Sequence, residues 1–137
     1  MSQENIVSSW LEHVHEDISA ANDMYKTGHW LYVGFLCHQA VEKAFKAYYT
    51  ATHDDDPPYT HSHMRLADVC GLADKLSDEH LRFIDFMVPM YIKARYPEQK
   101  LAAAQNLNAK VCEYVISTTK ELTQWIEQRL PNSKPLM

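Results

Sequence analysis

The sequence predicts an all-α protein, an up-and-down four-helix bundle with an additional short helix. Apolar residues recur at steps of three and four over three long segments, as they do on one face of an α-helix. No run of alternating apolar and polar residues and no Asn-Gly hairpin signal indicates a β-strand. The connections between the helical segments are short, which favours antiparallel neighbours in a bundle.

The first helix is expected from about residue 5 to residue 26. Gly28 follows it at the place where a left-handed C-terminal cap is needed. So short a turn brings the next helix back antiparallel to the first. The buried stripe of the first helix consists of apolar residues at helical spacing: Ile6, Trp10, Val14, Ile18, Ala21 and Tyr25.

The second helix, from residue 30 to about residue 50, is the predicted centre of the core. Its apolar surface is so wide that other elements must surround it. Only a narrow polar strip remains, formed by His38, Gln39, Glu42, Lys43 and Lys46. His38, Glu42 and Lys46 stand at successive i, i+4 positions and share one line along the helix. We therefore expect the central helix to display an ordered row of ionisable groups.

Residues 51–62 have no helical pattern. Three consecutive aspartates and two prolines in this stretch favour a mobile loop. Thr60 or Ser62 is expected to cap a short third helix that extends to about Asp74. Gly71 weakens that helix.

The fourth helix begins after Ser77, which can cap it. Pro89 lies inside the helical pattern and should kink the helix or divide it in two, because its ring removes a hydrogen bond and clashes with the preceding turn. The last helix is expected to start near residue 99 or 106 and to end at Leu130, before Pro131.

Length and composition predict one domain, residues 1–131, followed by a frayed tail at 132–137. The chain of 137 residues carries 13 Lys and Arg against 18 Asp and Glu, a net charge of −5. This balance argues against broad electrostatic binding to nucleic acid or to an anionic membrane, although a local basic patch is compatible with it. No stretch resembles a membrane span or a signal peptide. We expect a cytoplasmic protein.

The cysteines are odd in number and widely spaced: Cys37, Cys70 and Cys112. This usage fits a reducing compartment and argues against a disulfide framework or a zinc ribbon. Each cysteine lies in an apolar helical context, so we expect all of them to be small core residues.

Metal binding is one possible chemistry, because potential ligands are concentrated in one loop: His53, Asp54, Asp55, Asp56, His61 and His63. A stable site needs ligands on rigid elements, and this loop provides none. Cys37 and His38 are adjacent on a helix and about 100° apart, so they cannot act as a nucleophile pair. A glycine-rich phosphate loop is excluded by the three scattered glycines. We predict no metal, no cofactor and no catalytic residue.

Residues 91–98, YIKARYPE, allow two interpretations. In the first, they form a solvated helix end in which Arg95 opposes the negative pole of the helix and pairs with Glu42 or Glu98. In the second, Arg95 grips a phosphate through its planar fork while Tyr91 and Tyr96 offer stacking faces.

Three segments, FLCHQAVEKAFKAYY, PPYTH and YIKARYPE, in this order and spacing, resemble the HEPN domain family of bacteria and archaea. Together they extend over nearly the whole chain. The matching positions are Gln39, Ala40, Glu42, Lys43, Lys46, Thr60, His61 and Ala94 to Pro97. The resemblance implies a four-helix bundle plus a short helix, usually a homodimer. It also implies toxin–antitoxin association with a minimal nucleotidyltransferase, and either nucleotide binding or RNA cleavage.

One departure from the family pattern concerns catalysis. Ribonuclease members carry an Arg followed, after four to six residues, by a His, whereas Lys100, Leu101 and Ala102 occupy these positions after Arg95. Without the imidazole there is no general base for a ribose 2′-hydroxyl. We therefore predict a nucleotide-binding or partner-binding domain that does not cleave RNA. Two alternatives stay open: a metal-independent ribonuclease toxin in which His38 or His61 supplies the base, and a ligand-free interaction scaffold.

The predicted ligand site has Arg95 as its anchor. If the fourth helix packs beside the second, the cations of the central helix and the tyrosines converge on one cleft. The predicted ligand-binding residues are Arg95, Tyr96, Tyr91, Lys43, Lys46, His38 and His61.

Overall fold

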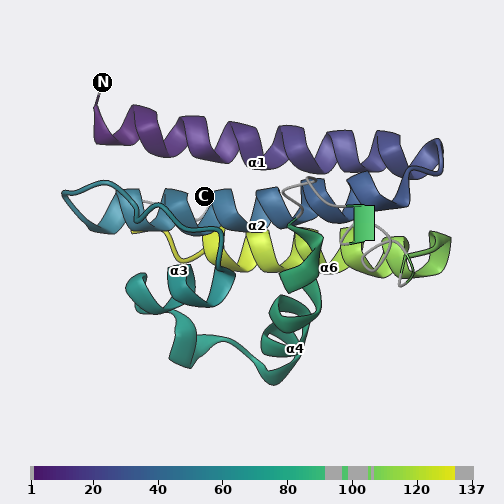
Figure 1. Cartoon of the computed structure of the whole chain (residues 1–137). Coiled ribbons are helices and arrows are strands. Elements are labelled where there is room, and N and C mark those ends of the chain that lie inside the picture. Colours follow the sequence, from purple (N-terminus) through teal and green to yellow (C-terminus); the bar gives the residue numbers. More distant parts are fainter. Residues whose placement is uncertain (1, 92–96, 99–104, 106, 132–137) are drawn as a thin grey trace.

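The computed structural model describes residues 2–91, 97–98, 105 and 107–131. Regular structure in this part of the chain is entirely helical, which confirms the predicted fold class (Figure 1). The elements are α1 (Gln3–Lys26), α2 (Trp30–Thr52), α3 (His63–Val69), the 3₁₀ turn η1 (Ala73–Lys75), α4 (Asp78–Met87), the 3₁₀ turn η2 (Val88–Met90) and α6 (Ala109–Glu127). Arg95, Tyr96 and the tail at 132–137 lie outside the described residues.

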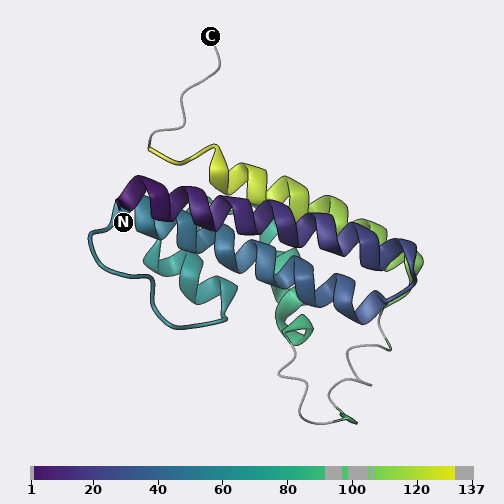
Figure 2. The same cartoon turned by 90° about the horizontal axis from the view of Figure 1, so that it is seen from above.

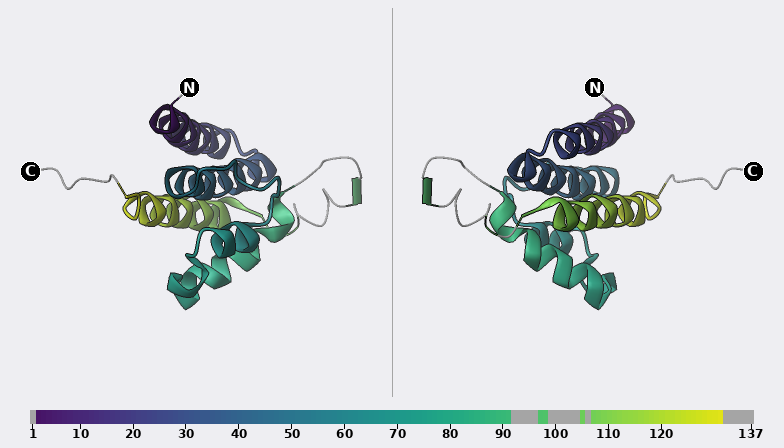
Figure 3. Two further views of the ribbon diagram at one scale, coloured as in Figure 1. Left: turned by 90° about the vertical axis from the view of Figure 1, so that its left-hand side faces the viewer. Right: turned by 90° about the vertical axis from the view of Figure 1, so that its right-hand side faces the viewer.

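Helix α2 occupies the middle of the bundle. It packs against α1, α6, α3 and η2, so the prediction that it must be surrounded is confirmed. Its apolar side chains are fully enclosed, with Val33, Val41 and Phe45 all at 0% exposure. Figure 3 shows α3 and α4 on the side of α2 and α6 that is opposite to α1. All three cysteines are buried in this core, as the sequence predicted.

Two helices end at a glycine with the same backbone conformation and hydrogen-bond pattern. Gly28 and Gly71 have φ angles of 76° and 72°, in the left-handed region. After α1, the N–H of Gly28 donates to the carbonyl of Tyr25, and the N–H of His29 donates to that of Met24. Gly71 and Leu72 repeat this pattern after α3, donating to Asp68 and Ala67. Both ends are Schellman caps.

The third helix is shorter than predicted. It ends at Val69, whereas the sequence pattern suggested about Asp74, because Gly71 terminates the helix instead of merely weakening it. Its start is confirmed, since the Ser62 hydroxyl accepts a hydrogen bond from the N–H of Arg65. The predicted cap of α4 is also present, with the Ser77 hydroxyl accepting from the N–H of His80.

Pro89 divides the fourth helical segment as predicted. Helix α4 ends at Met87, and Pro89 lies in the following 3₁₀ turn, η2. Helix α6 is capped by the Asn108 side chain, which accepts from the N–H of Val111, and it ends at Glu127, before the predicted Leu130. No helix within the described ranges is both long enough and apolar enough to span a bilayer.

Candidate ligand site on the central helix

The row of ionisable groups on α2 is buried. His38 is 2% exposed and Glu42 is 4% exposed, so the expectation that α2 displays this row is wrong. The chain that follows α2 covers it: the loop brings His61 against Glu42, and α3 brings His63 against His38. The polar strip is therefore an internal contact between α2 and the segment after it.

Glu42 is the centre of this cluster. One carboxylate oxygen accepts a hydrogen bond from Lys46 Nζ at 2.9 Å, and the other lies 2.9 Å from His61 Nδ1. An ionised carboxylate is costly to bury unless donors surround it, and here each oxygen has one. Because the carboxylate accepts from Nδ1, the His61 tautomer is fixed with its proton on that nitrogen.

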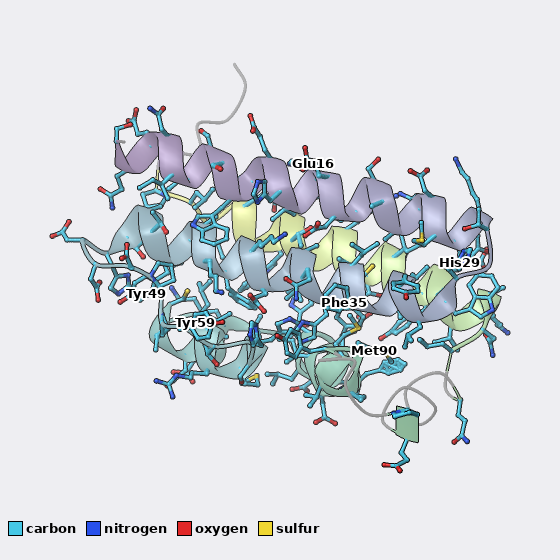
Figure 4. All side chains as sticks on the ribbon, turned by 45° about the horizontal axis from the view of Figure 1, so that its top comes forward. Glu16, His29, Phe35, Tyr49, Tyr59 and Met90 are labelled. Atoms are coloured by element: carbon cyan, nitrogen blue, oxygen red, sulfur yellow. The ribbon has the colours of Figure 1, made fainter. Side chains whose placement is uncertain are left out.

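Aromatic rings surround His61. Its ring stacks on that of Tyr91, with centroids 4.0 Å apart and planes inclined by 18°, and Tyr59 meets it edge-on. Phe35 stacks against Tyr91 at 6.3 Å. Burial, and then the negative charge of Glu42, raises the pKa of Tyr91 above its ordinary value. Figure 4 shows Phe35 and Tyr59 on the side of α2 that faces away from α1.

His38 and His63 form the deepest part of the cluster. Their ring centroids are 4.0 Å apart, and His63 Nε2 donates to the backbone carbonyl of His38 at 3.0 Å. Burial, reinforced by the neighbouring His63 and His61, lowers the pKa of His38 to about 2. Burial also lowers the pKa of His63 to about 4, against the opposing effects of its backbone hydrogen bond and of Glu42. Both rings are therefore neutral near pH 7. Within the described part of the chain, His38 Nδ1 has no hydrogen-bond partner.

The predicted site residues separate into three groups. His38, His61 and Tyr91 come together, with His38 and Tyr91 rings 5.4 Å apart, and Lys46 joins them through Glu42. Lys43 lies apart from the cluster, because its Nζ is 2.8 Å from Asp17 of α1.

The remaining two, Arg95 and Tyr96, lie outside the described residues. The alternative pairing of Arg95 with Glu42 or Glu98 therefore stays a prediction.

Sequence reasoning left four members of the cluster out of the site: Glu42, His63, Phe35 and Tyr59. Glu42 carried a usable signal, because it stands between His38 and Lys46 on one helical line. His63 carried none, since its role depends on where α3 packs.

The loop between α2 and α3 is attached at both ends. At its start the Tyr49 hydroxyl donates to both carboxylate oxygens of Asp55, each at 2.9 Å, and the His53 ring stacks on that of Tyr49 at 4.0 Å. Gln3 of α1 donates from Nε2 to the carbonyl of His53 at 2.8 Å. At its end His61 is held by Glu42. Over the residues that the structure describes, no group of three or more His, Cys, Asp or Glu side chains could hold a metal ion.

The described residues form a helical bundle whose central helix contacts a carboxylate–histidine–tyrosine cluster. The model of the HEPN domain family matches residues 7–129, so the chain belongs to that family. Among curated proteins no match is found.

Two solved structures share the fold. The crystal structure of TT1696 from Thermus thermophilus is 20% identical with a TM-score of 0.76, and the match covers 90% of this chain and 98% of that one. The structure of ST0689, an archaeal HEPN homologue, is 16% identical with a TM-score of 0.63, covering 90% of this chain and 97% of that one. At these identities the likeness concerns the fold alone.

Proposed function

We propose that this chain is a nucleotide-binding HEPN domain that does not cleave RNA. The observation that supports it is the fixed imidazole of His61, held by Glu42 and stacked on Tyr91. The His61 side chain is 28% exposed, and within the described part of the chain its second ring nitrogen, Nε2, makes no hydrogen bond. With the proton on Nδ1, Nε2 is an acceptor that suits a donor group of a base, and the aromatic rings offer stacking faces to that base.

The charges of α2 favour Arg95 as the anchor of this ligand. Lys43 and Lys46 are each paired with a carboxylate, at 2.8 and 2.9 Å, and are largely buried. They are therefore poor candidates for direct phosphate contacts. Arg95 follows Tyr91 by four positions and so lies within about 14 Å of it along any path of the chain. Its planar guanidinium can bind two phosphate oxygens at once.

Titration calorimetry with ATP, GTP and AMP tests this proposal. We expect Arg95→Ala to weaken binding about tenfold or more, because charge-assisted hydrogen bonds contribute about 1.5–3 kcal/mol each. Arg95→Lys should restore little, since an ammonium cannot hold two oxygens in one plane. The melting temperature should hardly move. Unfolding of Arg95→Ala would instead identify the residue as part of a structural ion pair. If no nucleotide binds the unmodified protein, the ligand-free scaffold is the better account.

A second candidate function, ribonuclease activity, is favoured by the Glu42–His61 pair. An imidazole held by a carboxylate is an arrangement that general bases use. We nevertheless expect labelled single-stranded RNA to remain intact, because the family's Arg-to-His spacing is absent. Cleavage by the purified protein that disappears in His61→Asn, which keeps a donor to Glu42, would establish this second function.

The proposal includes a protein partner, a minimal nucleotidyltransferase. It is supported by the family-like segments around Glu42 and Pro97. Co-expression with a nucleotidyltransferase encoded beside the gene should yield a complex that survives size-exclusion chromatography. Separate elution of the two chains at micromolar concentrations would remove this part of the proposal.

A further inference from the structure

A groove among the described residues lies away from the candidate site. It has a volume of about 530 Å³ and is formed where the start of α1 meets the ends of α2 and α6. Figure 2 shows these segments together at one end of the bundle. The groove is lined by Gln3, Glu4, Val7, Ser8, Leu11, Ala51, Glu127, Leu130 and Pro131. The His61 cluster, by contrast, lies on the side of α2 that faces α3.

The floor of this groove is an incompletely covered apolar face. The fully buried residues of α1 are confined to its later part: Val14, Ile18 and Ala21. Val7 and Leu11, one turn apart, are only half-buried and line the groove together with Ala51 and Leu130. Apolar side chains at i, i+4 on a helix form a continuous surface, so this end of α1 offers contact area that the bundle itself does not use.

The rim of the groove is acidic. Glu4 and Glu127 contribute carboxylates, and none of the lining residues that the structure describes is basic. Helices α2 and α6 end here, at Thr52 and Glu127, and contribute partial negative charge, whereas α1 begins here at Gln3 and contributes partial positive charge. The amide nitrogen of Gln3 is already committed to the carbonyls of Thr50 and His53. Glu127 lies 3.8 Å from His15 Nε2, whereas Glu4 has no ion-pair partner among the described residues. The two carboxylates therefore favour an occupant that carries positive charge.

The volume limits the shape of the occupant. Two turns of helix with their side chains, about 11 Å long and about 11 Å wide, would occupy roughly 1,000 Å³. The groove of about 530 Å³ does not enclose that volume, so an occupant places only part of its side chains inside it. It has room for a few side chains of an extended segment.

We propose that this groove docks a short extended segment of a partner protein, one in which lysine or arginine alternates with aliphatic side chains. The aliphatic groups cover Val7 and Leu11, and the cations face Glu4 and Glu127. The inference is independent of nucleotide binding, because the two sites share no residue.

The test uses two synthetic peptides, acetyl-Lys-Leu-Lys-Leu-Lys-amide and its twin with glutamate in place of each lysine. Amide NMR spectra of the full chain at low salt should shift at Val7, Leu11, Ala51 and Leu130 with the lysine peptide, and not at His61. The glutamate peptide should produce no shift. Equal responses to both peptides, or shifts confined to the His61 cluster, would overturn the proposal.

Charge-matched variants make the test specific. Glu4→Gln with Glu127→Gln should weaken binding of the lysine peptide about fivefold or more at low salt, because both rim charges are lost. Glu12→Gln with Glu16→Gln changes the net charge equally on the exposed face of α1 and should leave affinity within about twofold. Equal losses in the two double variants would contradict a groove-specific site.

Two further measurements distinguish other occupants of the groove: truncation of the chain after Pro131, and the mass of the protein in solution. If residues after Pro131 compete for the groove, a chain ending at Pro131 should bind the lysine peptide at least about tenfold more tightly. The occupant would then be this chain itself, against the proposal. Dissociation of a dimer by Glu4→Gln with Glu127→Gln would assign the groove to a second copy and would likewise overturn it.

Discussion

Two lysines of α2 are paired with carboxylates at nearly equal distance but in different surroundings. Glu42 has a side chain 5% exposed and accepts from both Lys46 and His61. Asp17 has a side chain 16% exposed and a single lysine partner, Lys43. Removing one member of a buried pair leaves an uncompensated charge, whereas solvent screens a more exposed pair.

Glu42→Ala should therefore lower the free energy of unfolding by about 2–4 kcal/mol. Asp17→Ala, the control for the more exposed pair between α1 and α2, should cost less than Glu42→Ala. Urea denaturation at pH 7 measures both. Equal losses of unfolding free energy in the two variants would mean that the cluster around Glu42 stabilises the fold no more than the Asp17–Lys43 pair does.

The two buried histidines predict a dependence of stability on pH. Both are neutral in the folded protein, with pKa values of about 2 for His38 and about 4 for His63. An unfolded chain protonates its histidines below about pH 6.5. The stability is therefore complete above that pH and is lost as the pH falls toward 4, at about 1.4 kcal/mol per pH unit for each histidine.

The variant His38→Phe/His63→Gln should flatten this loss between pH 7 and pH 5. His38 Nδ1 has no partner among the described residues, so a phenyl ring sacrifices no hydrogen bond there. Glutamine can still donate to the carbonyl that His63 reaches. The measurement is denaturant unfolding at pH 7, 6 and 5, with exposed His13→Gln as control. A slope equal to that of the unmodified chain would show that other groups carry the acid sensitivity.

At this scale the sequence predicted some site residues and not their environment. The i, i+4 line of His38, Glu42 and Lys46 was visible in the sequence, but polar residues on a helix normally indicate a solvated face. Their burial depends on His61 and His63, which return to α2 after a loop. Apolar periodicity predicts which residues of a helix share a face. It does not show which other segments of the chain pack on that face.

At the scale of elements, helix ends were the most predictable feature. Serine caps and glycine stops act through local hydrogen bonds, so Ser62, Ser77 and Gly28 could be located from sequence. The end of α3 differs from the predicted Asp74 because Gly71 ends the helix and is not an interior residue of it. The φ angle of Gly71 is 72°, in the left-handed region, and this conformation ends the helix. A φ angle cannot be read from the composition of the sequence.

Replacing Gly71 tests this backbone explanation. A Cβ atom at Gly71 would meet nothing within 4 Å, so the cost of Gly71→Ala is purely conformational, about 1 kcal/mol. Gly71→Asn should cost less, since asparagine tolerates the left-handed region better. Thermal melts of both variants provide the comparison. Alanine and asparagine variants of equal stability would argue against strain at this position.

At the scale of the whole molecule, exposed apolar side chains suggest self-association. Large hydrophobic residues remain at the surface of α2, α3, α4–η2 and α6 and of the loop: Tyr32, Tyr59, Met64, Val88 and Tyr114. We expect them to be partly covered in a homodimer, the arrangement that the family resemblance implies. Light scattering after size exclusion should report twice the mass of the chain. A single-chain mass at tens of micromolar would contradict this expectation.

The most direct test of the central claim compares two histidines of the same loop. His61 stacks on Tyr91 and His53 stacks on Tyr49, both with centroids 4.0 Å apart, but only His61 adjoins the buried cluster. Asparagine at either position keeps a donor where Nδ1 was and removes the ring. Titration with ATP should show binding weakened about tenfold in His61→Asn, about 1.4 kcal/mol, and changed less than about twofold in His53→Asn. Equal affinity of His61→Asn and the unmodified chain would contradict a nucleotide site at this cluster.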